Sequence, residues 1–142
     1  MAHLEIPLEN DRHVTIIHLG DLKEKDAEVI LRQMELWKDH FEWSKPVLSL
    51  DKRKMFGRQN NIPVMTVKSQ FVNEARQRCT DLLDMLNIKY TKDWKYEAHV
   101  TNPPDSWLYQ GVLEFVPQLD LHYRNREGQK LIKTIHLRRN DK

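Results

Sequence analysis

Apolar and polar residues alternate over short stretches of this chain, in the pattern of half-buried β-strands. Residues 13–19 (HVTIIHL) are rich in β-branched and apolar side chains and precede Gly20, so they predict a strand. Residues 46–50 (PVLSL) and 62–67 (IPVMTV) predict a β-hairpin, joined by a long and basic connection over residues 51–61. The first half of the chain is therefore expected to be rich in antiparallel strands.

Two other segments carry apolar residues at spacings of three and four, which is the period of an amphipathic helix. The first covers about residues 24–42, and the second begins after the capping residue Ser69 and ends near Asn87. Cys79 belongs to the apolar stripe of the second helix, so we interpret it as a core residue. A short strand (AHVT) that ends before Pro103 and a final hairpin (QLDLHY and LIKTIHL) complete the pattern.

The order of these elements predicts an α+β fold in a single domain over residues 1–142. Two units, each with a strand, a helix and a hairpin, follow one another in a roughly repeated order. We therefore expect two lobes, approximately residues 10–69 and 70–137, whose sheets face a central cleft with helices on the outside. Interleaving of strands between the lobes is compatible with this pattern.

Composition narrows the class of protein. Of 142 residues, 39% are hydrophobic and 31% are charged, which is typical of a globular domain. No apolar run approaches the ~20 residues that span a bilayer and no signal-peptide pattern is present, so we expect a cytoplasmic protein without a membrane partner. The single cysteine excludes an internal disulfide and a cysteine-based zinc cluster. No obligatory protein partner is indicated.

The distribution of charge is more informative than the net charge of +2, which argues against a protein that coats duplex nucleic acid. Residues 51–70 and 120–142 are locally basic, whereas residues 21–42 are acidic. Focused positive charge suits a small ligand that carries phosphate, and it equally fits the solvated faces of ordinary hairpins.

Two His-x-Thr triplets, His13 to Thr15 and His99 to Thr101, stand on predicted strands. Residues i and i+2 of a strand project from the same face, so each histidine shares a face with its threonine. If the two strands lie side by side or across a cleft, two imidazoles and two hydroxyls meet at one place. Such a site can bind phosphate through the hydroxyls and transfer protons through the imidazoles.

Nothing in the spacing of the residues indicates a metal or another cofactor. The sequence has no His-Glu-x-x-His motif and no acidic cluster at ligand spacing, and each histidine is accompanied by a hydroxyl in place of a carboxylate. We therefore expect a site without metal and without cofactors.

The segments RHVTIIHLGDL, MFGRQNNIPVMTVKS and YEAHVTN resemble the 2H phosphoesterases, a group that includes RNA 2',3'-cyclic phosphodiesterases, also called 2'-5' RNA ligase-like proteins. The resemblance covers most of residues 10–137. It implies a bilobal α+β cleft with pseudo-twofold symmetry, and hydrolysis, ligation or transesterification at 2'-linked or cyclic phosphates. On this chain it implies that His13 and His99 act as acid and base and that Thr15 and Thr101 bind phosphate. The chain is shorter than many members of the group, and its second motif is followed at once by Asn-Pro-Pro.

Four further residues are candidates for substrate binding. Phe56 and Arg58 lie on the expected connection of the first hairpin, where a ring can stack on a base and a guanidinium can hold phosphate. Trp107 and Tyr109 follow the second motif and are expected to form a lid or a base platform, with packing onto the core as the alternative. Trp94 and Tyr96 precede the second motif and make a weaker case of the same kind.

The remaining histidines are expected to be structural. His18 is predicted to lie on the opposite face of its strand from His13. Four more show no pattern of partners and are expected at the surface or in the core: His3, His40, His122 and His136.

The expected function is therefore that of a phosphodiesterase acting on a nucleotide, an oligonucleotide or an RNA end. The alternative is a non-catalytic module that binds nucleotides or RNA in the same cleft. The retention of two titratable imidazoles beside two hydroxyls favours the enzyme, because binding alone does not need them. The substrate, the scissile bond and the direction, hydrolysis or ligation, stay open.

Overall fold

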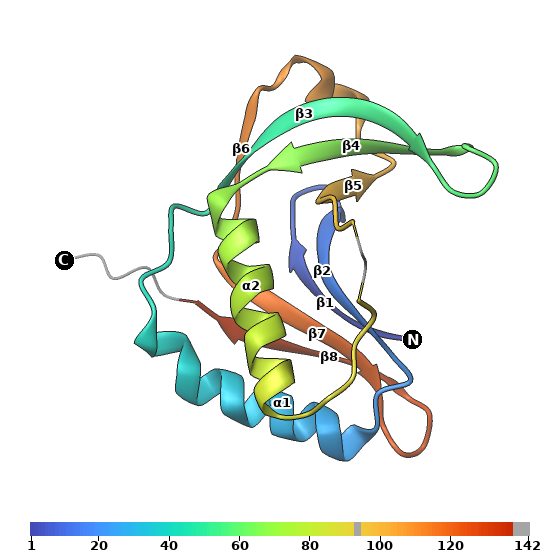
Figure 1. Ribbon diagram of the computed structural model, residues 1–142. Coiled ribbons are helices and arrows are strands. Elements are labelled where there is room, and N and C mark those ends of the chain that lie inside the picture. The colour runs from blue at the N-terminus through green and yellow to red at the C-terminus, as the bar shows by residue number, and fades with distance from the viewer. Residues whose placement is uncertain (93–94, 138–142) are drawn as a thin grey trace.

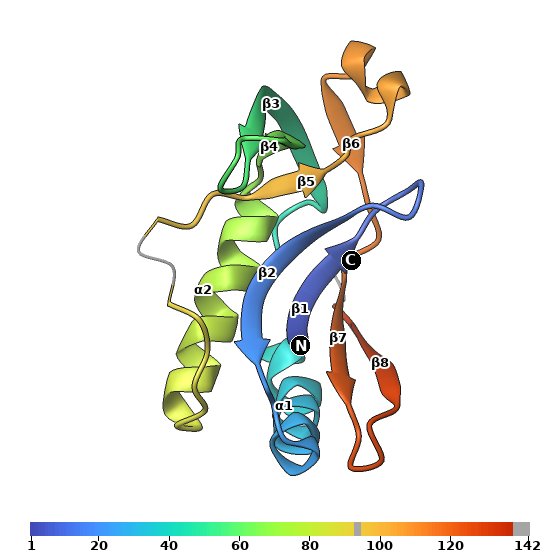
Figure 2. The same ribbon diagram turned by 90° about the vertical axis from the view of Figure 1, so that its right-hand side faces the viewer.

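The computed structural model describes residues 1–92 and 95–137 and shows an α+β fold of two four-stranded antiparallel sheets. The sheets meet at an angle, with one helix packed against the first sheet and the other packed against strands of both sheets (Figures 1 and 2). The fold class predicted from the hydrophobic pattern is thus confirmed. None of the helices in the described ranges is long and apolar enough to cross a membrane.

The first sheet joins the two ends of the chain and has the strand order β2-β1-β7-β8. Its strands are β1 (Ala2–Pro7), β2 (His13–Gly20), β7 (Gln118–Arg124) and β8 (Lys130–His136). The second sheet comes from the middle of the chain and has the order β5-β4-β3-β6. Its strands are β3 (Val47–Phe56), β4 (Ile62–Lys68), β5 (His99–Thr101) and β6 (Val112–Glu114). The sheets are therefore nested in the sequence, and a boundary near residue 69 does not separate them.

Three strand features differ from the expectation. β1 and β6 were not predicted, although residues 2–7 alternate between apolar and polar side chains. β3 continues to Phe56, so the connection expected over residues 51–61 shortens to residues 57–61. Most of the polar residues expected in that connection therefore belong to β3. They are exposed there because β3 curves away from the core near its end (Figure 1).

The two helices bury one apolar stripe each. α1 (Glu24–Trp37) ends before the predicted residue 42 and continues as the short 3-10 helix η1 (Lys38–His40). It packs against β7 and β8. α2 (Gln70–Met85) begins after Ser69, whose hydroxyl accepts a hydrogen bond from the Val72 amide at 3.2 Å, and it packs against β2 and β3. This cap confirms the predicted start of the helix.

Cys79 lies on the buried stripe of α2, where burial raises the pKa of its thiol to about 12. A thiol with so high a pKa stays protonated at neutral pH and is not a nucleophile. The structure therefore supports the core interpretation of Cys79.

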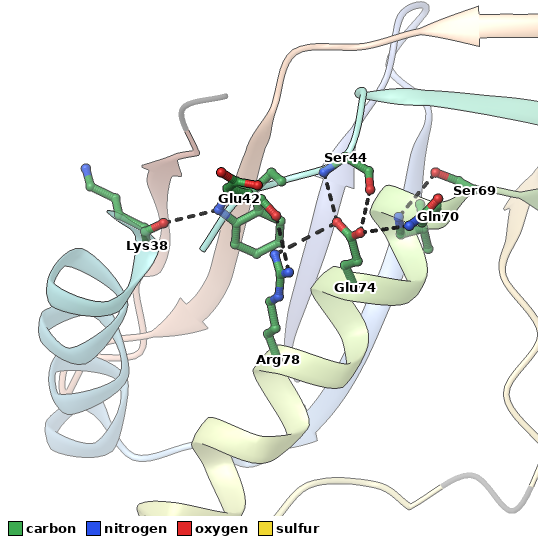
Figure 3. Close-up of polar contacts among 9 residues, drawn as sticks. Lys38, Glu42, Ser44, Ser69, Gln70, Glu74 and Arg78 are labelled. Atoms are coloured by element: carbon green, nitrogen blue, oxygen red, sulfur yellow. Dashed lines mark hydrogen bonds and ion pairs between the residues drawn. The ribbon is translucent and has the colours of Figure 1, made fainter. Parts of the chain in front are cut away.

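The segment that links the two sheets is tied to α2 by a polar network around Glu74 (Figure 3). The Glu74 carboxylate accepts hydrogen bonds from the amide of Ser44 at 2.9 Å and from the Ser44 hydroxyl. One turn further along α2, the Arg78 guanidinium stacks over the rings of Phe41 and Trp43 at 4.5 and 4.4 Å. These contacts hold the segment that leads into β3 against α2, and α2 itself packs against one strand of each sheet.

Candidate active site

The two His-x-Thr strands lie side by side at the place where the sheets meet. β2 and β5 are the edge strands of their sheets and contact each other (Figures 1 and 2). Near one end the Arg12 side chain donates to the carbonyl of Asn102 at 2.6 Å, and near the other the Tyr96 hydroxyl donates to the carbonyl of Thr15 at 2.8 Å. The earlier residue of the first strand thus meets the later residue of the second, so the two motif strands run antiparallel. His13 and His99 lie between these two hydrogen bonds.

α2 fixes this approach of the edge strands. The Arg76 guanidinium donates to the carbonyl of Ile16 on β2 at 2.5 Å and stacks over the Tyr96 ring at 3.9 Å. One side chain of the helix thus holds both the first motif strand and the segment that leads into the second. Tyr96 therefore has a positioning role that the sequence pattern did not indicate.

A cavity of about 250 Å³ lies at this junction and takes its walls from both sheets. Thr15 and His18 of β2 line one side, and Phe56 of β3 and His99 of β5 line the other. His13 and Thr101 are not among its lining residues. The structure therefore brings two of the four motif residues directly to one cavity and places the other two next to them on the same strands.

His99 is oriented by two neighbours. Its Nδ1 lies 2.9 Å from the carbonyl oxygen of Glu97, which can only accept, so Nδ1 carries the proton and Nε2 is left to act on a ligand. The Phe56 ring meets the His99 ring edge to face, with 4.8 Å between centroids. An imidazole held on two sides in this way is suited to proton transfer at a fixed place.

His13 faces a buried carboxylate from the neighbouring strand. Its side chain is 43% exposed, and its Nε2 lies 4.0 Å from Oε1 of Glu5 on β1. Partial burial lowers the pKa of His13 and the negative charge of Glu5 opposes that shift, while positive charge on His3, His122 and His99 lowers the pKa further. The net direction is downward, which favours the neutral imidazole near pH 7.

The expectation that His18 lies on the opposite face from His13 is wrong, and a β-bulge is the reason. Glu5 pairs with Thr15 and Leu4 pairs with Ile17, so Ile16 has no partner on β1. The extra residue shifts the alternation by one position. His18 consequently lies on the same open face as Thr15 and reaches the cavity.

His3 and His122 also belong to this face, although we expected them to be unrelated residues of surface or core. His3 pairs with His122 of β7 across the strands, and their rings stack at 4.4 Å between centroids. His3 Nε2 donates to Glu5 Oε1 at 2.6 Å. The expectation that each motif histidine is accompanied by a hydroxyl in place of a carboxylate therefore does not hold for His13, because Glu5, from a strand that was not predicted, lies 4.0 Å from its Nε2.

The substrate-binding candidates separate into two groups. Phe56 lies against His99, and Arg58 is an exposed residue of the turn after β3, so both stay candidates. Trp107 is only 1% exposed and packs in the hydrophobic core, so the expectation that it forms a base platform is wrong. Tyr109 is 93% exposed, at the end of the 3-10 helix η2 (Asp105–Tyr109), and stays a candidate. Trp94 lies outside the described residues.

A comparison with protein-family models finds no matching family, and a comparison with curated proteins finds no matching relative. The function of the site must therefore follow from its own geometry.

Proposed function

We propose that the protein is a metal-independent phosphodiesterase that acts on 2',3'-cyclic phosphates or on 2'-5' linked or cyclic nucleotides. The observation that carries the proposal is the antiparallel contact of the two His-x-Thr edge strands beside a cavity lined from both sheets. Two imidazoles on adjacent strands offer a proton acceptor and a proton donor to one phosphate. Two threonine hydroxyls offer hydrogen bonds to its non-bridging oxygens.

The proposed reaction needs only these groups and water. One imidazole accepts a proton from the attacking water as its oxygen forms the new bond to phosphorus. The other donates a proton to the ribose oxygen as the bond between that oxygen and phosphorus breaks. Protons and charge then balance over the step, and a second proton exchange with solvent restores both histidines.

The test is a substrate panel in the presence of EDTA: 2',3'-cyclic mononucleotides, 2'-5' oligoadenylates and cyclic dinucleotides, with products identified by mass. We expect turnover of at least one class, unchanged by the chelator, because the proposed site contains no metal-activated water. Complete loss of turnover in EDTA that added zinc or manganese restores would contradict this mechanism. Tight nucleotide binding without turnover of any class would favour the binding module.

Arg58 gives a second test because it follows Phe56 of the cavity wall by two residues but lies off the motif strands. Arg58→Gln should raise KM with little change in kcat if its guanidinium holds a distant phosphate of the substrate. Arg53→Gln is the matched control, since it removes the same charge from an exposed position of β3. Equal KM values for both variants and the unmodified protein would show that Arg58 does not bind the substrate and is a solvated residue of the turn.

A further inference from the structure

The open face of the first sheet gathers three histidines around one buried carboxylate oxygen. The Nε2 atoms of His3, His122 and His13 lie 2.6, 3.1 and 4.0 Å from Oε1 of Glu5. Glu5 itself is 7% exposed. The histidines come from β1, β7 and β2, which are neighbours in the sheet, so the cluster is held by three hydrogen-bonded strands (Figure 2).

Hydrogen bonding within the cluster leaves one nitrogen unsatisfied. His3 makes the hydrogen bond to Glu5. His122 Nε2 is buried and, over the residues that the structure describes, makes no hydrogen bond despite its proximity to the same oxygen. Because a buried polar atom without a partner is costly, native proteins satisfy most such atoms, and a bound ion can supply the missing partner.

We propose that His3, Glu5, His13 and His122 form a site for a divalent transition-metal ion. Three imidazole nitrogens and one carboxylate oxygen are donors that zinc takes in tetrahedral sites, with bonds of about 2.0–2.2 Å and therefore roughly 3.4 Å between ligand atoms. The distances to Glu5 Oε1 lie on both sides of that separation. His122 lies within 4.8 Å of Glu5 and Asp120 and is not grouped with His3 and His13, so its side chain must turn toward them to complete the set. The ligand atoms of His3, Glu5 and His13 already lie within 4.8 Å of one another.

The surroundings of the cluster also suit a cation. Asp120 pairs with Glu5 across β1 and β7, and its carboxylate accepts a hydrogen bond from Thr134 at 2.7 Å. The Asp120 carboxylate adds negative charge beside the ligands, and its hydrogen bond from Thr134 holds it in place. Outer-shell partners of metal sites have the same two features. The nitrogen-rich donor set favours zinc, copper, nickel or cobalt over magnesium or calcium, which prefer oxygen.

Occupation of this site would withdraw His13 from proton transfer. The metal is therefore expected to inhibit the phosphodiesterase and not to support it, a consequence that rests on the proposed function. His13 can act on the phosphate or bind the metal, but not both at once. We therefore expect turnover in EDTA and inhibition when the metal is added.

The experiment measures metal binding directly, on the full chain without a histidine tag and after dialysis against EDTA. Zn²⁺ is titrated by calorimetry, Mg²⁺ serves as the negative control, and Co²⁺ is added to record the visible spectrum of a tetrahedral site. His3→Gln and His122→Gln are compared with His40→Gln, a histidine of η1 outside the cluster. Circular dichroism verifies the fold of each variant.

We expect one Zn²⁺ per chain, a tetrahedral Co²⁺ spectrum, and at least tenfold weaker binding in His3→Gln and His122→Gln, because loss of even an outer-shell partner weakens metal sites by about 10- to 100-fold. His40→Gln should bind as the unmodified protein does. Absence of Zn²⁺ binding, or equal binding in folded His3→Gln and His122→Gln, would overturn the site. Zn²⁺ binding that leaves turnover unchanged would remove His13 from the ligand set.

Failure of the proposed function gives a different result. If the chain binds Zn²⁺ at these residues but turns over none of the nucleotides with or without EDTA, the metal site stands and the phosphodiesterase does not. If turnover requires Zn²⁺, the site stands and the metal-independent mechanism is overturned.

Discussion

Replacement of His13 or His99 by alanine is expected to lower kcat by about 10²- to 10⁴-fold, the usual contribution of a positioned general acid or base. His99 has its Nδ1 fixed by the Glu97 carbonyl and its ring against Phe56, which holds its Nε2 at one place beside the cavity. His13 is the corresponding group on the adjacent edge strand. Single-turnover rates in EDTA, with the best substrate of the panel, measure the effect without interference from metal.

The double variant should lose far less than the product of the two single losses. In the proposed mechanism acid and base act on the same phosphorus in one step, so once one imidazole is missing the other has little left to contribute. Multiplicative losses would instead mean that the histidines act in separate events. Full activity in either folded single variant would refute the proposed mechanism.

Stability must be measured beside these rates, because His13 takes part in the Glu5 cluster. Glu5 is buried, which by itself raises the pKa of its carboxyl, but its hydrogen bond from His3 and the charges of His13, His122 and His3 more than compensate and lower the pKa. Removal of His13 takes away only one of these contributions, and the lowered pKa of His13 makes that contribution small near pH 7. We therefore expect a small change in Tm, and His136→Ala on the same sheet serves as the control for loss of an exposed histidine.

The hydrophobic pattern predicted most of the helices and strands, because each of them buries one face and exposes the other. α2 shows this best: its apolar stripe and the Ser69 cap both appear in the sequence and both reappear in the structure. β2 and β5 were predicted equally well, since Val14 and Val100 are buried between neighbours that are partly or fully exposed. Of the two strands that were missed, β6 has three residues and pairs with β3, far away in the chain, whereas β1 has six residues and pairs with both the next strand, β2, and the distant β7.

The candidate site could be predicted only where side chains alternate regularly between the two faces of a strand. His13 and Thr15 share a face as predicted, but the bulge at Ile16 reverses the alternation for His18, and no residue type announces such a bulge. The Glu5 cluster depends on pairing between β1 and β7, which is a property of the nested topology and not of spacing along the chain. Trp107 was misplaced for a related reason, since a short loop gives no period from which burial can be inferred.

Thr15→Val is the second variant for which we expect a large effect, a loss of about 10- to 150-fold in kcat/KM. Thr15 lines the cavity shared by the two sheets, and in the proposed mechanism its hydroxyl donates to a phosphate oxygen. A hydrogen bond to a charged acceptor is worth roughly 1.5 to 3 kcal/mol, which converts to that range of rates. Valine keeps the shape of threonine, so packing around β2 should change little. Thr101→Val should act in the same direction.

Thr66 on β4 provides the matched control, because it is a buried threonine that pairs with His99 across the strands. Its hydroxyl already accepts a hydrogen bond from the Lys52 amide at 3.0 Å, so it is engaged within the second sheet. Thr66→Val should therefore lower the free energy of unfolding by about 1 to 3 kcal/mol, as expected when a buried amide loses its partner, while kcat/KM stays near the unmodified value. Thr15→Val should show the reverse pattern, with a loss of rate and an unchanged Tm. If both variants lost stability and neither lost rate, Thr15 would be a structural threonine, and the phosphate would have to be bound elsewhere.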